Sequence, residues 1–201
     1  MKRIVLLALL ALALPLAAVA GSVDFSNSGG TLTGSSAGLT LVGSELTVVS
    51  GFNGGGIVTG NLGSVNFSTG SLISVNSSGG ATFNGGGTFT ITGNGGGGLP
   101  NGTIFSGSFS GPVVLTLQSS TASGNIYTIS GPISGTWYNG ATVTGATSQI
   151  YLFTGKNGWM GSSTVGSGDT ILSTVPEPGT LGLLGTGLVG LAGVVRKKLK
   201  S

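Results

Sequence analysis

Short apolar runs that alternate with turn residues dominate the chain between residues 21 and 175. In the run Thr88–Thr92, Phe89 and Ile91 would face one way and the threonines the other, which is the two-residue period of a strand. Comparable runs, rich in β-branched and aromatic residues, lie at 39–42, 45–49, 113–117, 126–129 and 149–153. No part of this segment shows the stripe of an amphipathic helix. The pattern therefore predicts an all-β domain.

The spacing of these runs, about eight to twelve residues, suits a sandwich or a barrel. Asn-Gly dipeptides, which favour tight hairpin turns, begin at Asn53, Asn84, Asn94, Asn101, Asn139 and Asn157. A β-solenoid is the alternative, because glycine-rich Thr/Asn sequences also build solenoids, but a solenoid repeats at a fixed period. The chain has no such period, as uneven intervals separate Phe25, Phe67, Phe83 and Phe105. We therefore predict an antiparallel β-sandwich, with the solenoid as the alternative.

Residues 1–20 have the layout of a secretory signal peptide. Lys2 and Arg3 form a basic start, and an apolar run leads to Ala18-Val19-Ala20. Ala18 and Ala20 make the A-x-A site at which signal peptidase would cut after passage through the secretion translocon. An uncleaved membrane anchor is the alternative, but the apolar run is short for one.

The C-terminal segment combines a stiff linker, an apolar run and a basic end. Pro176 and Pro178 fix their own backbone and bias the residues before them to extended geometry, so Pro176-Glu177-Pro178 stays extended and accessible to a protease. The uncharged run Thr180–Val195 would rise about 24 Å as a helix, slightly less than a hydrocarbon core of about 30 Å. Snorkelling basic side chains would cover the difference. We predict one transmembrane helix, followed by a cytoplasmic basic anchor of Arg196, Lys197, Lys198 and Lys200.

In this order, the Pro176-Glu177-Pro178 triplet, the glycine- and leucine-rich span and the basic end resemble the PEP-CTERM sorting signal of Gram-negative bacteria that make exopolysaccharide. The resemblance implies processing by an exosortase-like membrane peptidase that cuts near the triplet, so that the membrane holds the protein before processing. It covers the tail and leaves the fold of the rest open. The chain then divides into a signal peptide (1–20), a β-rich exported domain (21–174) and a sorting signal (175–201). The alternative is an ordinary linker before a stop-transfer helix.

Composition limits the chemistry of the exported domain. The chain has 42 glycines, no cysteine, no histidine and 5% charged residues, against about 25% in an average protein. Lys156 is the only basic residue between the two ends, so the domain lacks the clustered cations that bind phosphate backbones. Nucleic acid is therefore excluded as a partner. Without cysteine the domain has neither disulfides nor thiolate metal sites.

Catalytic groups are also scarce. General acid–base catalysis needs a histidine or carboxylates whose environments push their pKa values apart. The carboxylates of the domain are Asp24, Glu45 and Asp169, which lie far apart in the sequence, whereas a glycosidase needs two that face one pocket. The Asp-rich loop of a calcium site is missing. We predict no enzymatic activity, no cofactor and no metal; a hydrolytic enzyme ranks last among the alternatives.

The uncharged Thr/Ser/Asn-rich composition suits contact with hydrated polymers. We therefore predict a structural or adhesive protein of the cell surface or the extracellular matrix, associated with exopolysaccharide. The alternative is a carbohydrate-binding module, in which Trp137, Tyr138 and Trp159 would offer flat apolar faces to sugar rings. Against this, large aromatic side chains commonly fill a core.

Overall fold

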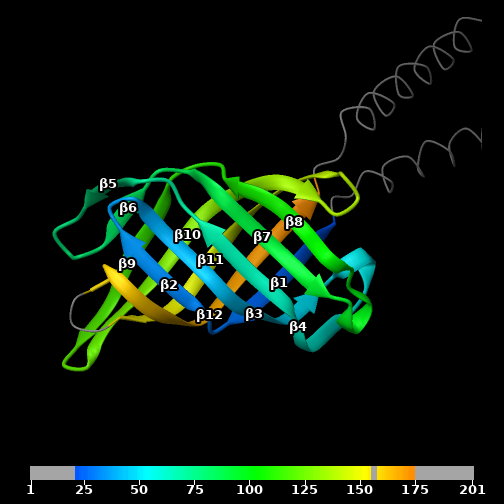
Figure 1. Cartoon of the computed structure of the whole chain (residues 1–201), viewed down its shortest axis with the longest axis horizontal. Helices are drawn as coiled ribbons and strands as arrows, with labels where there is room; N and C mark the ends of the chain where they lie inside the picture. Colours follow the sequence, from blue (N-terminus) through cyan, green and yellow to red (C-terminus); the bar gives the residue numbers. More distant parts are fainter. Residues whose placement is uncertain (1–20, 155–157, 175–201) are drawn as a thin grey trace, which may run out of the picture. The chain divides into compact units, whose positions relative to one another are not determined.

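The computed structural model describes residues 21–154 and 158–174, which form strands joined by turns (Figure 1). The strands are β1 (Ser22–Ser28), β2 (Thr31–Ser35), β3 (Gly38–Ser50), β4 (Ile57–Ser68), β5 (Leu72–Val75), β6 (Ala81–Phe83), β7 (Gly86–Asn94), β8 (Asn101–Phe109), β9 (Val113–Thr121), β10 (Gly124–Trp137), β11 (Thr142–Thr154) and β12 (Gly161–Thr174). Two short 3₁₀ helices, η2 (Phe52–Gly54) and η3 (Gly96–Gly98), lie between strands. The predicted all-β class is confirmed.

All twelve strands belong to one sheet, which closes on itself. The pairings run from β3 through β4, β7, β8, β10 and β11 to β12, and every one of them is antiparallel. β1 and then β2 pair with β12 on one side and with β3 on the other. Figure 1 shows the strands slanting around this closed sheet, with β2, β3 and β7 on the near side and β10 and β11 behind them.

The predicted sandwich is therefore wrong. A sandwich has two sheets packed face to face, whereas here the last strand of the domain pairs with the first two, as in the register Ser22↔Ser173. The solenoid is not found either, because the ladders are antiparallel. Strand spacing and alternation, the basis of both predictions, do not specify whether the ends of a domain pair with each other. The strand spacing allows two architectures, and the structure has the one in which the sheet is closed.

Apolar side chains fill the inside of the closed sheet. Phe67, Phe89, Phe105 and Phe109 are at most 2% exposed, and their ring centroids lie 5.5–6.2 Å apart in the contacting pairs. The interior of a closed sheet of about eight strands around is just wide enough for side chains to fill it. The inward positions thus form the core, and the outward positions carry mostly small polar residues.

A buried polar cluster links the strands at which the sheet closes. The Asn27 amide on β1 donates to Gln149 Oε1 on β11 at 3.2 Å, and the Gln149 amide donates to Asn27 Oδ1 at 3.3 Å. Both residues pair in register with Gly168 on the intervening strand β12, so the two side chains meet over a glycine. Asn27 also donates to Ser44 Oγ on β3 at 2.6 Å. We call the Asn27–Gln149 pair the amide bridge.

Several predictions concern residues outside the described part of the chain. These are the signal-peptidase site at Ala18 and Ala20, the Pro176-Glu177-Pro178 triplet, the transmembrane helix and the basic anchor. Within residues 21–154 and 158–174, no helix is long and apolar enough to cross a membrane.

Candidate functional site

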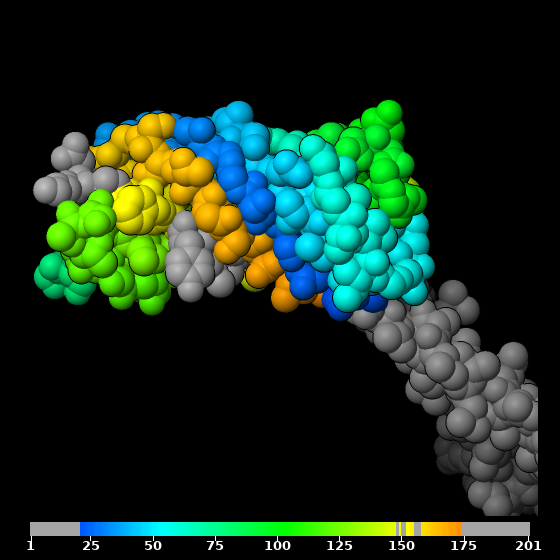
Figure 2. All heavy atoms as spheres, turned by 90° about the horizontal axis from the view of Figure 1, so that it is seen from below, coloured from blue at the N-terminus to red at the C-terminus, as the bar shows by residue number. Residues whose placement is uncertain are grey.

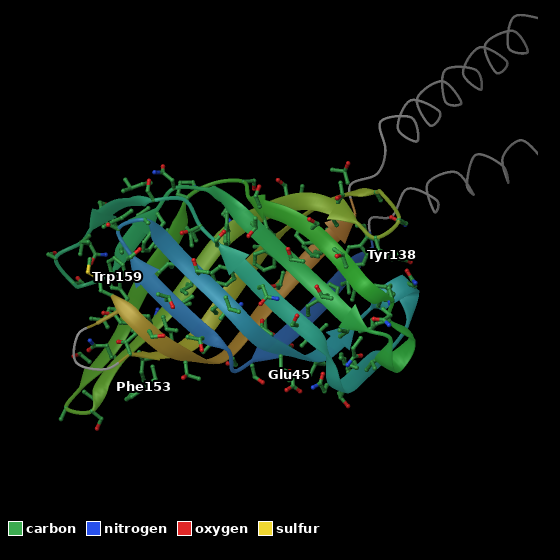
Figure 3. All side chains as sticks on the ribbon, viewed as in Figure 1. Glu45, Tyr138, Phe153 and Trp159 are labelled. Carbon is green, nitrogen blue, oxygen red and sulfur yellow. The ribbon has the colours of Figure 1, made fainter. Side chains whose placement is uncertain are left out.

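A pocket of about 350 Å³ lies where the β5–β6 turn, the start of β10 and the segment before β12 come together. It is lined by Val75, Gly79, Asn125, Tyr127, Gly158, Trp159 and Met160. We call it the mouth pocket, because these segments lie at one end of the closed sheet; Figure 3 labels Trp159 there.

Two buried aromatic residues form the inner wall of the mouth pocket. Trp159 is 5% exposed and meets Phe83 of β6 edge to face, with ring centroids 5.3 Å apart. Gly34 of β2 allows this position, since a Cβ there would collide with the main-chain oxygen of Trp159. Tyr127 of β10 is 2% exposed. The contacts of Trp159 with Phe83 and Gly34 therefore fix its ring before any ligand arrives.

Polar groups in the pocket come from β10. Burial raises the pKa of the Tyr127 phenol, and the hydrogen bond with the Asn125 side chain offsets part of the rise. The phenol is therefore protonated at neutral pH, and Asn125 adds amide donors and a carbonyl acceptor. The wall combines aromatic surface with neutral hydrogen-bonding groups.

The opposite end of the closed sheet has its own aromatic cluster. Trp137, 7% exposed, packs between Phe25 and Phe52 with ring centroids 5.8 and 5.7 Å away. Tyr138 is 43% exposed, stacks on Phe52, and its hydroxyl lies 3.2 Å from the Asn53 amide nitrogen. A smaller pocket of about 160 Å³ adjoins this cluster and includes Asn139.

The three predicted glycan-contact residues do not form one platform. Figure 3 shows Trp159 and Tyr138 at opposite ends of the closed sheet. Both tryptophans are buried and Tyr138 is the exposed member. Core packing accounts for Trp137, whereas Trp159 also lines the mouth pocket. Sequence reasoning missed Asn125, Met160 and Val75, which the fold brings together from three separate segments. A Met next to Trp159 in a glycine-rich turn was the only local signal.

The three carboxylates of the described residues lie on the outside of neighbouring strands. Asp24 on β1 pairs with Ile171, and Ser26 pairs with Asp169 on β12, so the two aspartates are diagonal neighbours. Glu45 lies on β3, on the other side of β1. Figure 2 shows dark blue β1 with orange β12 on one side and cyan residues on the other. Folding thus brings two carboxylates close on the outer face of the sheet, but neither lines the mouth pocket.

We expect Asp24→Asn to stabilise the protein at neutral pH. Burial, followed by repulsion from Asp169, raises the pKa of Asp24 above its ordinary value of 3.8, and one of its oxygens is buried without a hydrogen-bond partner. The folded state therefore binds this proton more tightly than the unfolded state, and stability falls as pH rises from 3.8 through the raised folded-state pKa.

Urea denaturation at pH 7 and at pH 3 would measure this effect. The advantage of Asp24→Asn should be present at pH 7 and vanish at pH 3, where Asp24 is protonated in both states. Glu45→Gln on the exposed face of β3 is the matched control. An equal advantage of Asp24→Asn at both pH values would contradict the electrostatic origin.

Metal-binding groups are sparse in the same region. Among residues 21–154 and 158–174, no group of three or more His, Cys, Asp or Glu side chains could hold a metal ion. Lys156, the predicted interior cation, lies outside the described residues.

A row of small polar residues crosses the outside of five neighbouring strands. Register pairs Asn66 on β4 with Thr90 on β7, Thr90 with Ser106 on β8, Ser106 with Thr136 on β10, and Thr136 with Thr142 on β11. Adjacent strands lie about 4.8 Å apart, so the side chains repeat at that interval. Ser106, Thr136 and Thr142 are exposed, and the other two are partly exposed. We call this set, four hydroxyl residues and Asn66, the hydroxyl row.

Comparison with known proteins bears on the tail. Residues 174–197 match the family model described as the PEP-CTERM protein-sorting motif. Comparisons with curated proteins and with solved structures gave no match. The match includes all three residues of the predicted Pro176-Glu177-Pro178 triplet and reaches the closed sheet at Thr174, the last residue of β12.

Proposed function

Because its PEP-CTERM motif makes this chain an exported protein that an exosortase processes at the membrane, we propose that its closed sheet is a non-catalytic adhesive element of the exopolysaccharide matrix or cell surface. The observation that carries the proposal is the hydroxyl row, a regular array of neutral hydrogen-bonding groups across β4, β7, β8, β10 and β11.

Neutral hydroxyls suit a polymer of neutral sugars. Each hydrogen bond that replaces water contributes only about 0.5–1.5 kcal/mol, so a single contact is weak. A row that meets successive sugar units multiplies these contacts, since the second contact forms at high effective concentration once the first is made. Adhesion then depends on the number of aligned groups rather than on one deep site.

The charge distribution supports the same function. The charged side chains of the described residues are Asp24, Glu45 and Asp169, all on β1, β3 and β12. The strands of the hydroxyl row therefore present no charge, and binding through them should be insensitive to salt.

The filled interior and the scarcity of catalytic groups support a role in binding rather than in turnover. Phenylalanine, leucine and isoleucine side chains occupy the inside of the closed sheet. The chain has no histidine or cysteine, and the two neighbouring carboxylates lie on the outer face of the sheet rather than facing each other across a pocket. Contacts with other molecules are then left to the outer face and the ends.

Co-sedimentation with the polymer of the native host tests the proposal. Processed protein, purified from the host and identified by its intact mass, should be retained equally at 50 mM and 500 mM salt. Changing Thr90, Thr136 and Thr142 together to valine removes the hydroxyls at nearly constant shape and should weaken retention by about tenfold or more. The matched triple change to serine keeps the hydroxyls and should retain binding. Unchanged retention of the valine variant, or retention lost in salt, would contradict the proposal.

A further inference from the structure

The mouth pocket has a lining that the hydroxyl row lacks. Val75 and Met160 are 53% and 52% exposed and lie at its rim, while Trp159 and Tyr127 form the inner wall. Large apolar side chains exposed beside buried aromatic ones mark a place where a ligand removes apolar surface from water.

The polar side chains among the described lining residues are neutral. They are the Asn125 amide and the Tyr127 hydroxyl, both on β10. The charged residues Asp24, Glu45 and Asp169 of the described part lie elsewhere, and none of them lines the pocket. A charged ligand would lose hydration there, and the described lining residues offer it no counter-charge. The lining therefore favours an uncharged ligand that has both apolar faces and hydroxyl groups.

Local hydrogen bonds hold the pocket walls in place. Asn76 Oδ1 accepts from the main-chain N–H of Gly80 at 2.8 Å and of Ser78 at 3.1 Å. These bonds fix the β5–β6 turn, in which Gly79 adopts a φ of 84°. Rigid walls reduce the entropy lost when a ligand binds. The volume of about 350 Å³ is at the small end of the range for small-molecule sites, about 300–1,000 Å³.

From this geometry we propose that the mouth pocket binds a single neutral sugar ring of the polymer that the hydroxyl row contacts, an inference that rests on the proposed function. The C–H faces of the ring lie against Met160, Val75 and the aromatic wall, and its hydroxyls exchange hydrogen bonds with Asn125 and Tyr127. The row gives extended, weak adhesion, and the pocket selects which sugar occupies the end or branch of the chain.

Tryptophan fluorescence provides a direct test, because the chain has two tryptophans and they lie at opposite ends. In processed Trp137→Phe protein, Trp159 is the only reporter. Titration with glucose, galactose, mannose and their disaccharides should give a saturable change for at least one of them, and glucuronic acid should give none. Asn125→Ala and Met160→Ala should each weaken binding by about tenfold. Asn139→Ala, in the smaller pocket at the other end, is the matched control.

The outcomes separate the two proposals. If no neutral sugar changes the Trp159 signal while retention on the host polymer persists, the pocket inference fails and the proposed function stands. If sugar binding is seen but survives both Asn125→Ala and Met160→Ala, the pocket is not the site and the inference also fails. If the unmodified protein is not retained on the host polymer, the proposed function itself fails. Near-ultraviolet circular dichroism would show that each variant keeps its aromatic packing.

Discussion

Replacing Phe89 by alanine should lower the free energy of unfolding by about 3–5 kcal/mol, the usual cost of removing a fully buried phenylalanine. Phe89 is 0% exposed and its ring contacts those of Phe67, Phe105 and Phe109. The closed β-strand backbone around this cluster limits how far the neighbouring side chains can collapse into the space left behind. The loss is therefore expected near the upper end of the range.

Urea denaturation of the processed protein would measure this difference. Thr90→Ala is the matched control, because Thr90 is the next residue on β7 and faces outward. It should cost about 1 kcal/mol or less, the span of strand propensities in a host protein. Equal losses for the two variants would mean that the inward face of β7 is not the one that packs the core.

The success of the strand prediction and the failure of the sandwich have a common origin. Alternation in Thr88–Thr92 is a local property, and the predicted faces are confirmed, since Phe89 and Ile91 are fully buried. Sheet closure depends on pairs such as Ser22↔Ser173, for which neither partner carries a distinguishing side chain. A local pattern can predict which side chains of a strand face the core without predicting which strands pair with it.

Turn prediction shows the same limit. Asn139-Gly140 does form a turn between β10 and β11, whereas Asn101-Gly102 lies within β8, where Gly102 pairs with Gly93 of β7. The ladder overrides the local preference of the dipeptide there, and Gly102 pairs with a φ of 122°, a value that glycine adopts and L side chains rarely do.

The candidate site was still harder to predict. The mouth pocket joins Val75, Asn125 and Met160 from segments that are far apart in the sequence. None of the three stands out by type, and the tryptophans that did stand out are buried. Asp24 and Asp169 are also far apart in the sequence, and pairing of β1 with β12 brings them onto neighbouring strands. By contrast, the sorting signal is contiguous, and its order of triplet, apolar span and basic end identified it from the sequence.

Gly168→Ala should cost about 3 kcal/mol or more, although it adds only a methyl group. Gly168 pairs with Asn27 on one side and Gln149 on the other, and a Cβ at this position would overlap the Gln149 amide. The amide bridge then breaks, and its buried donors and acceptors lose their partners, each at about 1–3 kcal/mol. Overpacking adds a further cost of about 1–3 kcal/mol.

A double-mutant cycle with Gln149→Ala tests this mechanism. Gln149→Ala alone leaves the Asn27 amide, 1% exposed, without its partner on β11 and should cost about 2 kcal/mol. In the double variant the alanine methyl occupies space that the glutamine has left, so the combined loss should fall short of the sum by about 1–3 kcal/mol, as for residues in contact. Strict additivity of the two losses would show that Gly168 is needed for its backbone geometry. A shortfall would show that Gly168 is needed because its lack of a side chain leaves space for the hydrogen bonds between Asn27 of β1 and Gln149 of β11 across β12. The closure of the sheet would then depend on the absence of a side chain at this one position.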